Sequence, residues 1–319
     1  MNLLITGVSG AIGQAVVKYL THHNRFERVV AIDRQAPTVL GPCHFIKAHL
    51  NQIELADILV TDDINCVLHL AGSGQNSNPR MESQTALKVL KAAKAAGCNR
   101  VVIPSRDWVY RRGDKPSSEE SPLRESRLRS RGFSAATTHV AARLGWAPVE
   151  AKLLLESVIS DFRDSCVTCD VVVPRFCTVL SNSSTLALRK LFDAPFLVSS
   201  QKNEPRFQFL HIDDAARFLI VCAQQDGLSG AYNLAGPDQL TLTAVAGILE
   251  KKVIHLPRWS LGVVLNIFAR LRLFGFSRSA LLKLRQASPL CIQRASDELG
   301  DPELTSRQAL ALWRTNQSR

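Results

Sequence analysis

The stretch that decides the fold is LLITGVSGAIG, residues 3–13. An apolar run typical of a β-strand leads into three glycines, Gly7, Gly10 and Gly13, and a helical pattern of apolar residues follows at once. In such a strand–turn–helix the first glycine allows a sharp turn, the second lets a pyrophosphate approach the backbone, and the third lets the helix pack closely on the strand. Free N–H groups and the positive dipole end of the helix complete a phosphate site. The stretch therefore predicts that the chain binds a dinucleotide.

A second apolar run, residues 29–32, ends in Asp33, about 20 residues after the last glycine. A carboxylate at this distance accepts hydrogen bonds from the ribose hydroxyls and repels a 2′-phosphate, which favours NAD as the cofactor. Arg34 beside it could stack on the adenine or meet that phosphate, so NADP stays open as the alternative. Between the glycines, we expect Ser9, Ala11 and Ile12 to contact the cofactor as well.

Strand and helix patterns alternate through the first half of the chain. Uninterrupted apolar strands separated by helices are typical of a parallel sheet that is covered on both faces. We expect such strands at 44–46, 66–70, 100–103 and 171–173, and helices at about 85–96 and from 148 onward. The sequence thus predicts an α/β fold, a Rossmann-type doubly wound parallel sheet with a smaller C-terminal substrate lobe. The predicted division is an NAD(P)-binding domain at 1–180, to which 211–237 return, and a substrate lobe at 181–210 and 238–319.

The second half gives weaker patterns. Asp213 is the expected cap of a helix, and either Thr241 or Thr243 caps a further one at 244–249. Residues 259–273 form an amphipathic pattern, which we interpret as a helix that packs on the main domain rather than on a membrane. Residues 111–145, rich in Arg, Ser and Gly, are expected to form a long exposed loop.

The chain has 319 residues and a formal net charge of +11. Residues 251–296 contain no Asp or Glu, so this basic tract supplies most of the excess. It favours a phosphate-bearing or other anionic small molecule as ligand, with a solvated helix surface as the equal alternative. Nucleic acid and membrane are not expected partners, because no RNA-binding aromatic signature occurs and the longest apolar run near the end is too short to span a bilayer. Since the chain opens on a core strand, we expect a cytoplasmic protein without a signal peptide.

Most of the eight cysteines lie inside apolar runs, as reduced core cysteines do. Only Cys166-Val167-Thr168-Cys169 has the spacing of a metal or redox site. No second C-x-x-C and no histidine pair accompanies it, so we interpret it as a turn before the strand at 171–173 and expect no metal.

Several further motifs carry a resemblance to a known family. They are Thr6-Gly7-x-x-Gly10-x-x-Gly13, His69-Leu70-Ala71-Gly72, Val173-Pro174-Arg175-Phe176, Phe209-Leu210-His211-Ile212-Asp213-Asp214, Tyr232-Asn233-Leu234-Ala235-Gly236 and Ala295-Ser296-Asp297-Glu298-Leu299-Gly300. Together they resemble the extended short-chain dehydrogenases/reductases, the NAD-dependent epimerases and dehydratases of nucleotide sugars.

This resemblance implies a nucleotide-sugar-like substrate and assigns roles to particular residues. Leu70, Ala71 and Gly72 would lie beside the cofactor, and Lys152 would hold the nicotinamide ribose, since Lys152 and Glu156 match the family's K-x-x-x-E spacing. Arg175 is the substrate-side candidate. The helices at 85–96 and 148–162 match those that pair in family dimers, which suggests a homodimer.

The catalytic pattern of the family is broken. Its Tyr-x-x-x-Lys pair occurs nowhere in this chain, and the tyrosine position is Pro148. The carbonyl-polarising Ser/Thr falls on Arg106, with Ser105 one residue short; the helix asparagine falls on Glu82, and an acid after the third strand on His49.

Two hypotheses about function stay open. In one, an oxidoreductase or epimerase uses a non-standard acid–base group, with Tyr110, Ser105 and Lys152 as catalytic candidates and Asp107 as a helper. In the other, the chain is an inactive dinucleotide-binding sensor, scaffold or regulator.

Overall fold

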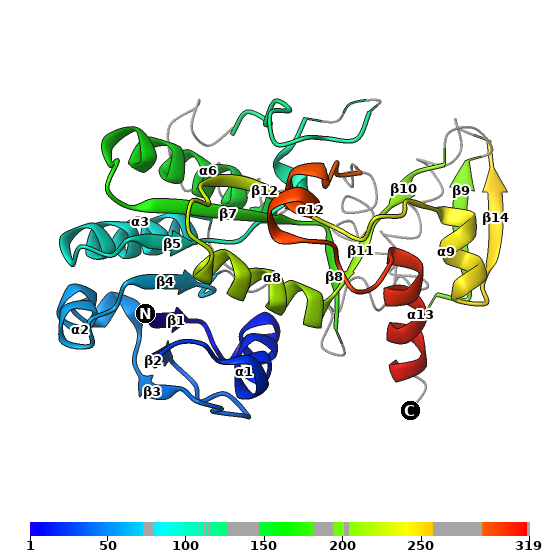
Figure 1. Cartoon of the computed structure of the whole chain (residues 1–319). Helices are drawn as coiled ribbons and strands as arrows, with labels where there is room; N and C mark the ends of the chain where they lie inside the picture. Colours follow the sequence, from blue (N-terminus) through cyan, green and yellow to red (C-terminus); the bar gives the residue numbers. More distant parts are fainter. Residues whose placement is uncertain are drawn as a thin grey trace.

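The computed structural model describes residues 1–72, 79–111, 113, 115–126, 147–181, 194–200, 204–257 and 289–317. A parallel sheet of eight strands forms the centre of this part (Figure 1). Its order is β12-β7-β5-β4-β1-β2-β3, with the short β6 paired to β7. These strands are β1 (Asn2–Thr6), β2 (Arg28–Asp33), β3 (His44–Lys47), β4 (Cys66–His69), β5 (Arg100–Val102), β6 (Ser105–Arg106), β7 (Asp170–Phe176) and β12 (Gly230–Leu234).

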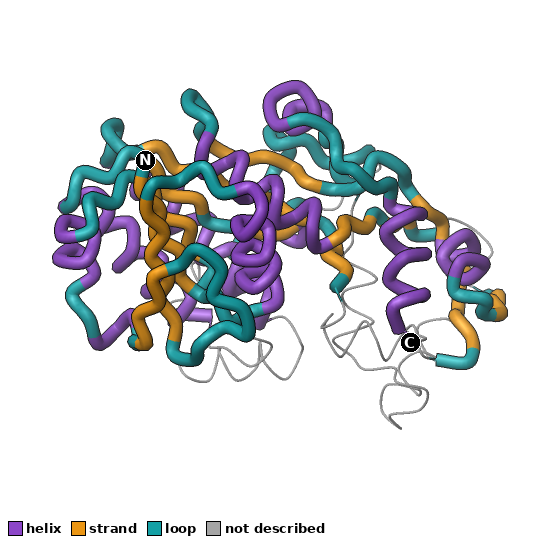
Figure 2. Tube along the Cα trace, turned by 60° about the horizontal axis from the view of Figure 1, so that its bottom comes forward, coloured by secondary structure: helices purple, strands orange, loops and turns teal. Residues whose placement is uncertain are grey.

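Both faces of the sheet are covered, which is why its central strands are apolar throughout. Side chains of β1 alternate between two separate apolar clusters: Leu3 and Ile5 join one, and Leu4 joins the other. The first cluster includes side chains of α1 (Ala11–His23) and α8 (Ile212–Gln224), and the second includes those of α2 (Leu55–Thr61), α3 (Pro79–Ala95) and α6 (Ala147–Ser165). Figure 2 shows these layers from a second direction. The doubly wound α/β fold predicted from the sequence is confirmed.

The position of β1 fixes where a ligand can bind. It pairs with β2 on one side and with β4 on the other, so the chain crosses over in opposite directions from it. At such a switch point the loops after the strands diverge and leave a crevice at the carboxyl edge of the sheet. The glycine loop directly follows β1 at that edge.

A third apolar cluster lies apart from the sheet and includes Phe207, Leu242 and Trp313. It belongs to the region drawn at the right of Figure 1. In the described part of the chain, this region and its connections contain three two-stranded pairs and two helices. They are β8 (Thr178–Leu180) with β11 (Phe209–His211), β9 (Phe196–Ser200) with β14 (Lys252–Leu256), β10 (Arg206–Phe207) with β13 (Leu240–Thr241), and α9 (Leu242–Ile248) and α13 (Ser306–Gln317). A further helix, α12 (Gln293–Leu299), buries Ala295 and Leu299 in the first cluster of the sheet. The division into two domains stays a prediction.

Several local expectations change. α3 begins at Pro79, earlier than the expected start near residue 85. The prediction that Asp213 caps α8 is wrong: the cap is His211, whose Nδ1 accepts a hydrogen bond from the Asp213 amide. Thr241, rather than Thr243, caps α9, because its hydroxyl accepts from the Ala244 amide. The expected helix at 259–273 and residues 127–145 of the expected loop lie outside the described residues. Within the described ranges, every helix is too short or too polar to cross a membrane.

Candidate functional site

Two of the three loop glycines are required by the fold itself. Gly7 has a φ of +82°, and a Cβ on it would lie 2.4 Å from the Ala71 nitrogen. A Cβ on Gly13 would lie 2.3 Å from the Gly7 carbonyl oxygen. Neither contact can be relieved by moving a side chain, because both partners are backbone atoms. Gly7 and Gly13 therefore allow β1, the loop after β4 and the start of α1 to pack together.

Gly10 is different. It is exposed, its φ is −69°, and the nearest atom to an added Cβ would be the Gly7 oxygen at 3.4 Å, an ordinary contact. None of the described residues requires glycine here. The space beside it lies at the N-terminus of α1, whose first turn carries no acidic residue and whose cap makes no side-chain hydrogen bond. An anion such as a pyrophosphate fits this end of the helix, where backbone N–H groups are free to bind it.

Asp33 closes the other side of the loop. Its Oδ2 accepts hydrogen bonds from the Ser9 amide at 2.9 Å and from the Ser9 hydroxyl at 2.6 Å, and its Oδ1 accepts from the Arg34 amide at 2.6 Å. The carboxylate predicted to bind ribose hydroxyls thus lies directly at the glycine loop. Arg34 is exposed, and Ala11 and Ile12 are half-buried in the first turn of α1.

The segment after β4 lies against the glycine loop. The Leu70 amide donates to the Thr6 carbonyl at 2.9 Å, and the Ala71 amide donates to the Thr6 hydroxyl at 3.3 Å. His69 lies behind them, with its Nδ1 2.7 Å from the same hydroxyl. Burial lowers the pKa of His69 to about 4, so its imidazole is neutral near pH 7. The predicted contact segment Leu70–Gly72 and the predicted loop therefore lie against each other at the carboxyl edge of the sheet.

Lys152 on α6 lies near the segment after β4, and it forms an ion pair with a residue that the sequence did not identify as its partner. Its Nζ donates to Glu82 Oε1 at 2.5 Å and to the Pro104 carbonyl at 3.1 Å. The Glu82 side chain is 3% exposed and that of Lys152 is 19% exposed. A Cβ on Gly72 would lie 3.3 Å from Glu82 Oε1, which places this ion pair beside the loop after β4. The signal that could have found it is the substitution of Glu82 at the family's asparagine position.

Tyr110 is not brought to Lys152. Its hydroxyl donates to Asn233 Oδ1 at 2.7 Å and accepts from Arg175 Nη1 at 2.7 Å. The same guanidinium makes two parallel hydrogen bonds, each 2.9 Å long, to the carboxylate of Glu156. Burial raises the pKa of Tyr110 to about 12, although Arg175 opposes the shift. The phenol is therefore neutral near pH 7 and held inside a buried network. Arg175 fixes the Tyr110 hydroxyl by donating a hydrogen bond to it, and a substrate role for Arg175 stays a prediction.

The other catalytic candidates lie around this network. Ser105 on β6 is 1% exposed and is paired in register with Arg175, and among the described residues its hydroxyl has no hydrogen-bond partner. Pro148 occupies the first turn of α6, one turn before Lys152, where its ring suits the helix start. A proline cannot accept or donate a proton, so this position of α6 supplies no acid–base group.

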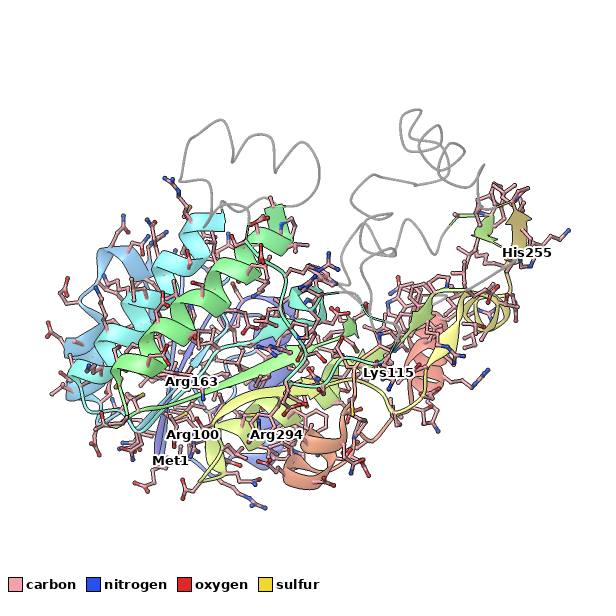
Figure 3. All side chains as sticks on the ribbon, turned by 90° about the horizontal axis from the view of Figure 1, so that it is seen from above. Met1, Arg100, Lys115, Arg163, His255 and Arg294 are labelled. Carbon is pink, nitrogen blue, oxygen red and sulfur yellow. The ribbon has the colours of Figure 1, made fainter. Side chains whose placement is uncertain are left out.

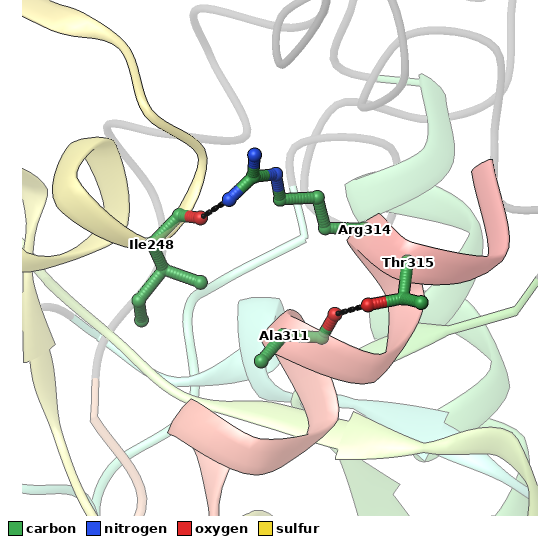
Figure 4. A pocket seen from close by; sticks show the side chains of 4 residues that line it. All are labelled: Ile248, Ala311, Arg314 and Thr315. Carbon is green, nitrogen blue, oxygen red and sulfur yellow. Dashed lines mark hydrogen bonds between the residues drawn. The ribbon is translucent and has the colours of Figure 1, made fainter. Parts of the chain in front are cut away.

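Elsewhere, a hollow is lined by Ile248 of α9 and by Ala311, Arg314 and Thr315 of α13 (Figure 4). Arg314 there donates to the Ile248 carbonyl at 2.9 Å and pairs with Glu250. This hollow holds none of the predicted site residues. No group of three or more metal-ligating side chains occurs in the ranges that the structure describes.

Residues 3–235 match the model of the NAD dependent epimerase/dehydratase family. The chain belongs to this family. The matched range includes the glycine loop, Asp33, the Leu70–Gly72 segment and Lys152, and NAD, the cofactor predicted from Asp33, is the cofactor of the family. A search of curated proteins found no match.

Solved structures of epimerases and dehydratases have the same fold. MoeE5 in complex with UDP-glucuronic acid and NAD is 21% identical, with a TM-score of 0.69 and 100% of both chains covered. TunA, an NAD dependent NDP-hexosamine 5,6-dehydratase involved in tunicamycin biosynthesis, is also 21% identical, with a TM-score of 0.68 and coverage of 100% of this chain and 98% of TunA. The UDP-glucose 4-epimerase of Thermotoga maritima, with UDP-glucose, is 16% identical, with a TM-score of 0.68 and coverage of 100% and 99%.

Proposed function

We propose that this chain binds NAD along the glycine loop and a nucleotide-sugar-like ligand at the same carboxyl edge, and that it acts without a tyrosine acid–base. The observation that carries the proposal is the open space at Gly10. A glycine that the fold does not need, at a helix N-terminus free of acidic residues and next to Asp33, is best explained by a ligand that approaches the backbone.

The residues present fit the cofactor. The backbone of Gly7–Gly13 would bind the pyrophosphate, Asp33 the adenine ribose hydroxyls, and Lys152 the nicotinamide ribose through the hydrogen of its ammonium that Glu82 and Pro104 do not use. NAD supplies a hydride acceptor when bound. The nucleotide-sugar-like ligand is supported by the family and by the ligands that the titles of its structural neighbours name.

Hydride transfer also needs a group that moves a proton, and Glu82 favours this activity. Its carboxylate lies beside Lys152 and beside the loop after β4. In the family, the lysine lowers the pKa of a tyrosine that this chain lacks, so Glu82 is the proton-transfer group that we propose in its place. Tyr110 favours the second candidate function, an inactive sensor, scaffold or regulator, because its hydroxyl is fully used within the protein.

The decisive experiment compares two glycine substitutions. Gly10→Val fills the space that the pyrophosphate would take. Gly247→Val makes the same change at an exposed helix glycine, where no atom of the described residues lies within 4 Å of an added Cβ. We expect Gly10→Val to weaken NAD binding at least about tenfold in calorimetric titration, since charge-assisted hydrogen bonds are lost. Gly247→Val should leave it unchanged. Equal affinities for both variants would remove the proposed site.

Turnover separates the two candidate functions. UDP-glucose and UDP-glucuronic acid, with NAD, are the probes, and the variants are Glu82→Gln and Tyr110→Phe. The enzyme with a carboxylate acid–base is supported if the natural chain turns over a probe, if Glu82→Gln lowers the rate by about two decades or more, and if Tyr110→Phe keeps the rate. NAD binding without turnover of either probe supports the inactive alternative.

A further inference from the structure

Arg106 is the last residue of β6 and lies at the carboxyl edge of the sheet. In Figure 3, Met1 and Arg100 mark the opposite, amino edge, from which the strands run toward the second region of the molecule. Arg106 is paired in register with the last residue of β7. It follows two residues after Pro104, whose carbonyl accepts a hydrogen bond from Lys152 at 3.1 Å. Arg106 therefore lies at the edge where we propose that both ligands bind.

The guanidinium of Arg106 is held on two sides. Its Nη1 donates a hydrogen bond to the Cys177 carbonyl at 3.3 Å, and its Cζ lies 5.0 Å from the centre of the Trp108 ring. Both Arg106 and Trp108 are half-buried, and Trp108 packs against the first apolar cluster. A guanidinium that stacks on an aromatic face and is hydrogen-bonded through one nitrogen keeps a defined plane. Its Nε and Nη2 have no hydrogen-bond partner among the described residues.

The neighbouring strand shows what such a guanidinium edge binds. On β7, the Nε and Nη2 atoms of Arg175 donate to the two carboxylate oxygens of Glu156, each at 2.9 Å, while Nη1 donates to the Tyr110 hydroxyl. The two parallel N–H groups of this edge match the two oxygens of a carboxylate. Arg106 is anchored through the same nitrogen, and its Nε–Nη2 edge is open. It has the geometry of a carboxylate site without the carboxylate.

The adjacent Asp107 does not supply that carboxylate. Within the described ranges, no ion pair joins Arg106 to any acidic side chain, and Oδ1 of Asp107 has no hydrogen-bond partner. Asp107 is also deeply buried, and burial raises its pKa to about 7, so a large share of its carboxyl is protonated near neutral pH. The positive charge of Arg106 is therefore available to an anionic group of a ligand.

We propose that Arg106 binds the carboxylate of an acidic sugar, so that the nucleotide-sugar-like ligand of this chain is a nucleotide uronic acid. Nε and Nη2 donate to the two oxygens of that carboxylate. This inference rests on the proposed function, in which the sugar lies beside the nicotinamide whose ribose Lys152 would hold. Hydride transfer requires the reacting sugar carbon to lie against the nicotinamide ring. An anion within reach of β6 then belongs to the sugar rather than to the diphosphate.

The test is a calorimetric titration of the full chain, saturated with NAD, with two probes. UDP-glucuronic acid carries a carboxylate where UDP-glucose carries a hydroxymethyl group, and the two are otherwise identical. We expect UDP-glucuronic acid to bind at least about tenfold tighter, because two charge-assisted hydrogen bonds are gained. Equal affinities, or tighter binding of UDP-glucose, would overturn this inference and leave the proposed function standing. Binding of neither probe would overturn it together with the nucleotide-sugar part of the proposed function.

Three variants assign the preference to the guanidinium. Arg106→Gln should weaken UDP-glucuronic acid at least about tenfold and change UDP-glucose by less than about twofold, with NAD affinity as the check on folding. Arg106→Lys keeps the charge but not the two parallel donors, so it should keep only part of the preference. Arg163→Gln removes an exposed charge near the end of α6, at the amino edge (Figure 3), and should change neither affinity.

The two probes share their diphosphate, which separates the two possible anions. If Arg106→Gln weakens both probes equally, the guanidinium binds the diphosphate, and the assignment to a sugar carboxylate is wrong. A preference for UDP-glucuronic acid that survives in Arg106→Gln would also contradict it, because another residue would then bind the carboxylate.

Discussion

The two ends of the proposed crevice differ in how far their residues keep the pattern of the family. At the end formed by β1 and β2, the glycine loop and Asp33 keep the pattern of the family, and backbone contacts hold them in place. At the end formed by β5 and β7, a proline stands at the predicted tyrosine position, Pro148, and a buried carboxylate pairs with Lys152. The contrast teaches that the backbone fixes the geometry of the proposed NAD site, whereas the proposed proton transfer would depend on a few side chains that can be exchanged without altering the fold.

The largest effect should come from breaking the first end. Gly7→Ala adds a Cβ that overlaps the Ala71 nitrogen and forces a side chain into a φ of +82°. We expect the free energy of unfolding to fall by about 3 kcal/mol or more, measured by denaturant unfolding.

Gly97→Ala is the matched control. Gly97 has a φ of +72°, but an added Cβ there meets no atom of the described residues within 4 Å. Gly97→Ala introduces the conformational strain without the overlap, so its free energy of unfolding should fall by only about 1 kcal/mol. Equal losses at the two positions would mean that the packing of β1 against the loop after β4 is not what requires Gly7.

The second effect tests whether water is excluded from the β5–β7 end, where the carboxyl of Asp107 is buried. Asp107 is 4% exposed, and burial raises its pKa to about 7, although Arg106 and nearby hydrogen bonds oppose the shift. The folded chain therefore binds a proton that the unfolded chain has released, between about pH 4 and pH 7. Stability is present at the low end of this window and is lost as the pH rises through 7.

Asp107→Asn removes this titration. Because each pKa unit corresponds to about 1.4 kcal/mol, the natural chain should lose a few kcal/mol more than the variant between about pH 4 and pH 8. Urea unfolding at several pH values measures the difference. Parallel stability curves for the two proteins would show that Asp107 is hydrated and that this end is open to water.

The Lys152–Glu82 pair gives a third, smaller effect. Glu82→Gln leaves the lysine without its carboxylate in a mostly buried place, and we expect a loss of about 1–3 kcal/mol in stability. Lys152→Met should cost about as much, and the double variant should lose less than the sum of the two single losses. Additive losses in this cycle would contradict the pairing.

The smallest effect concerns the Tyr110 hydroxyl, and it tests most sharply whether the buried network lies outside the proposed NAD site. Tyr110→Phe removes the hydrogen bonds to Asn233 and Arg175, which should lower stability by about 1–2 kcal/mol and leave NAD affinity unchanged. Tyr19→Phe, on α1 where the ring stacks on His23, should change neither. A fall in NAD affinity at constant stability in Tyr110→Phe would place this phenol in the crevice after all.

The sequence predicted the first end because backbone requirements leave a residue signature. A turn at positive φ and a close helix–strand contact admit only glycine, and the uninterrupted apolar runs of β1, β4 and β7 indicate a sheet covered on both faces. The same reasoning predicted Asp33 at the loop and the turn at 166–169.

The second end could not be predicted in the same way. Tyr110 and Arg175 are 65 residues apart, and no local pattern shows that their side chains meet in one buried network. Glu82 and Lys152 are 70 residues apart, and the ion pair exists only because α3 and α6 pack side by side on one face of the sheet. Even the cap of α8 was assigned to the wrong residue, because a histidine nitrogen is an unusual acceptor at that position.

The measurement that tests the central claim most directly is a calorimetric titration of the purified chain with NAD, NADH, NADP and NADPH. The account predicts binding of NAD and NADH, and affinities for NADP and NADPH at least about tenfold weaker, because the Asp33 carboxylate repels a 2′-phosphate. Absence of binding by all four dinucleotides would contradict the account, since the open space at Gly10 would then have no ligand.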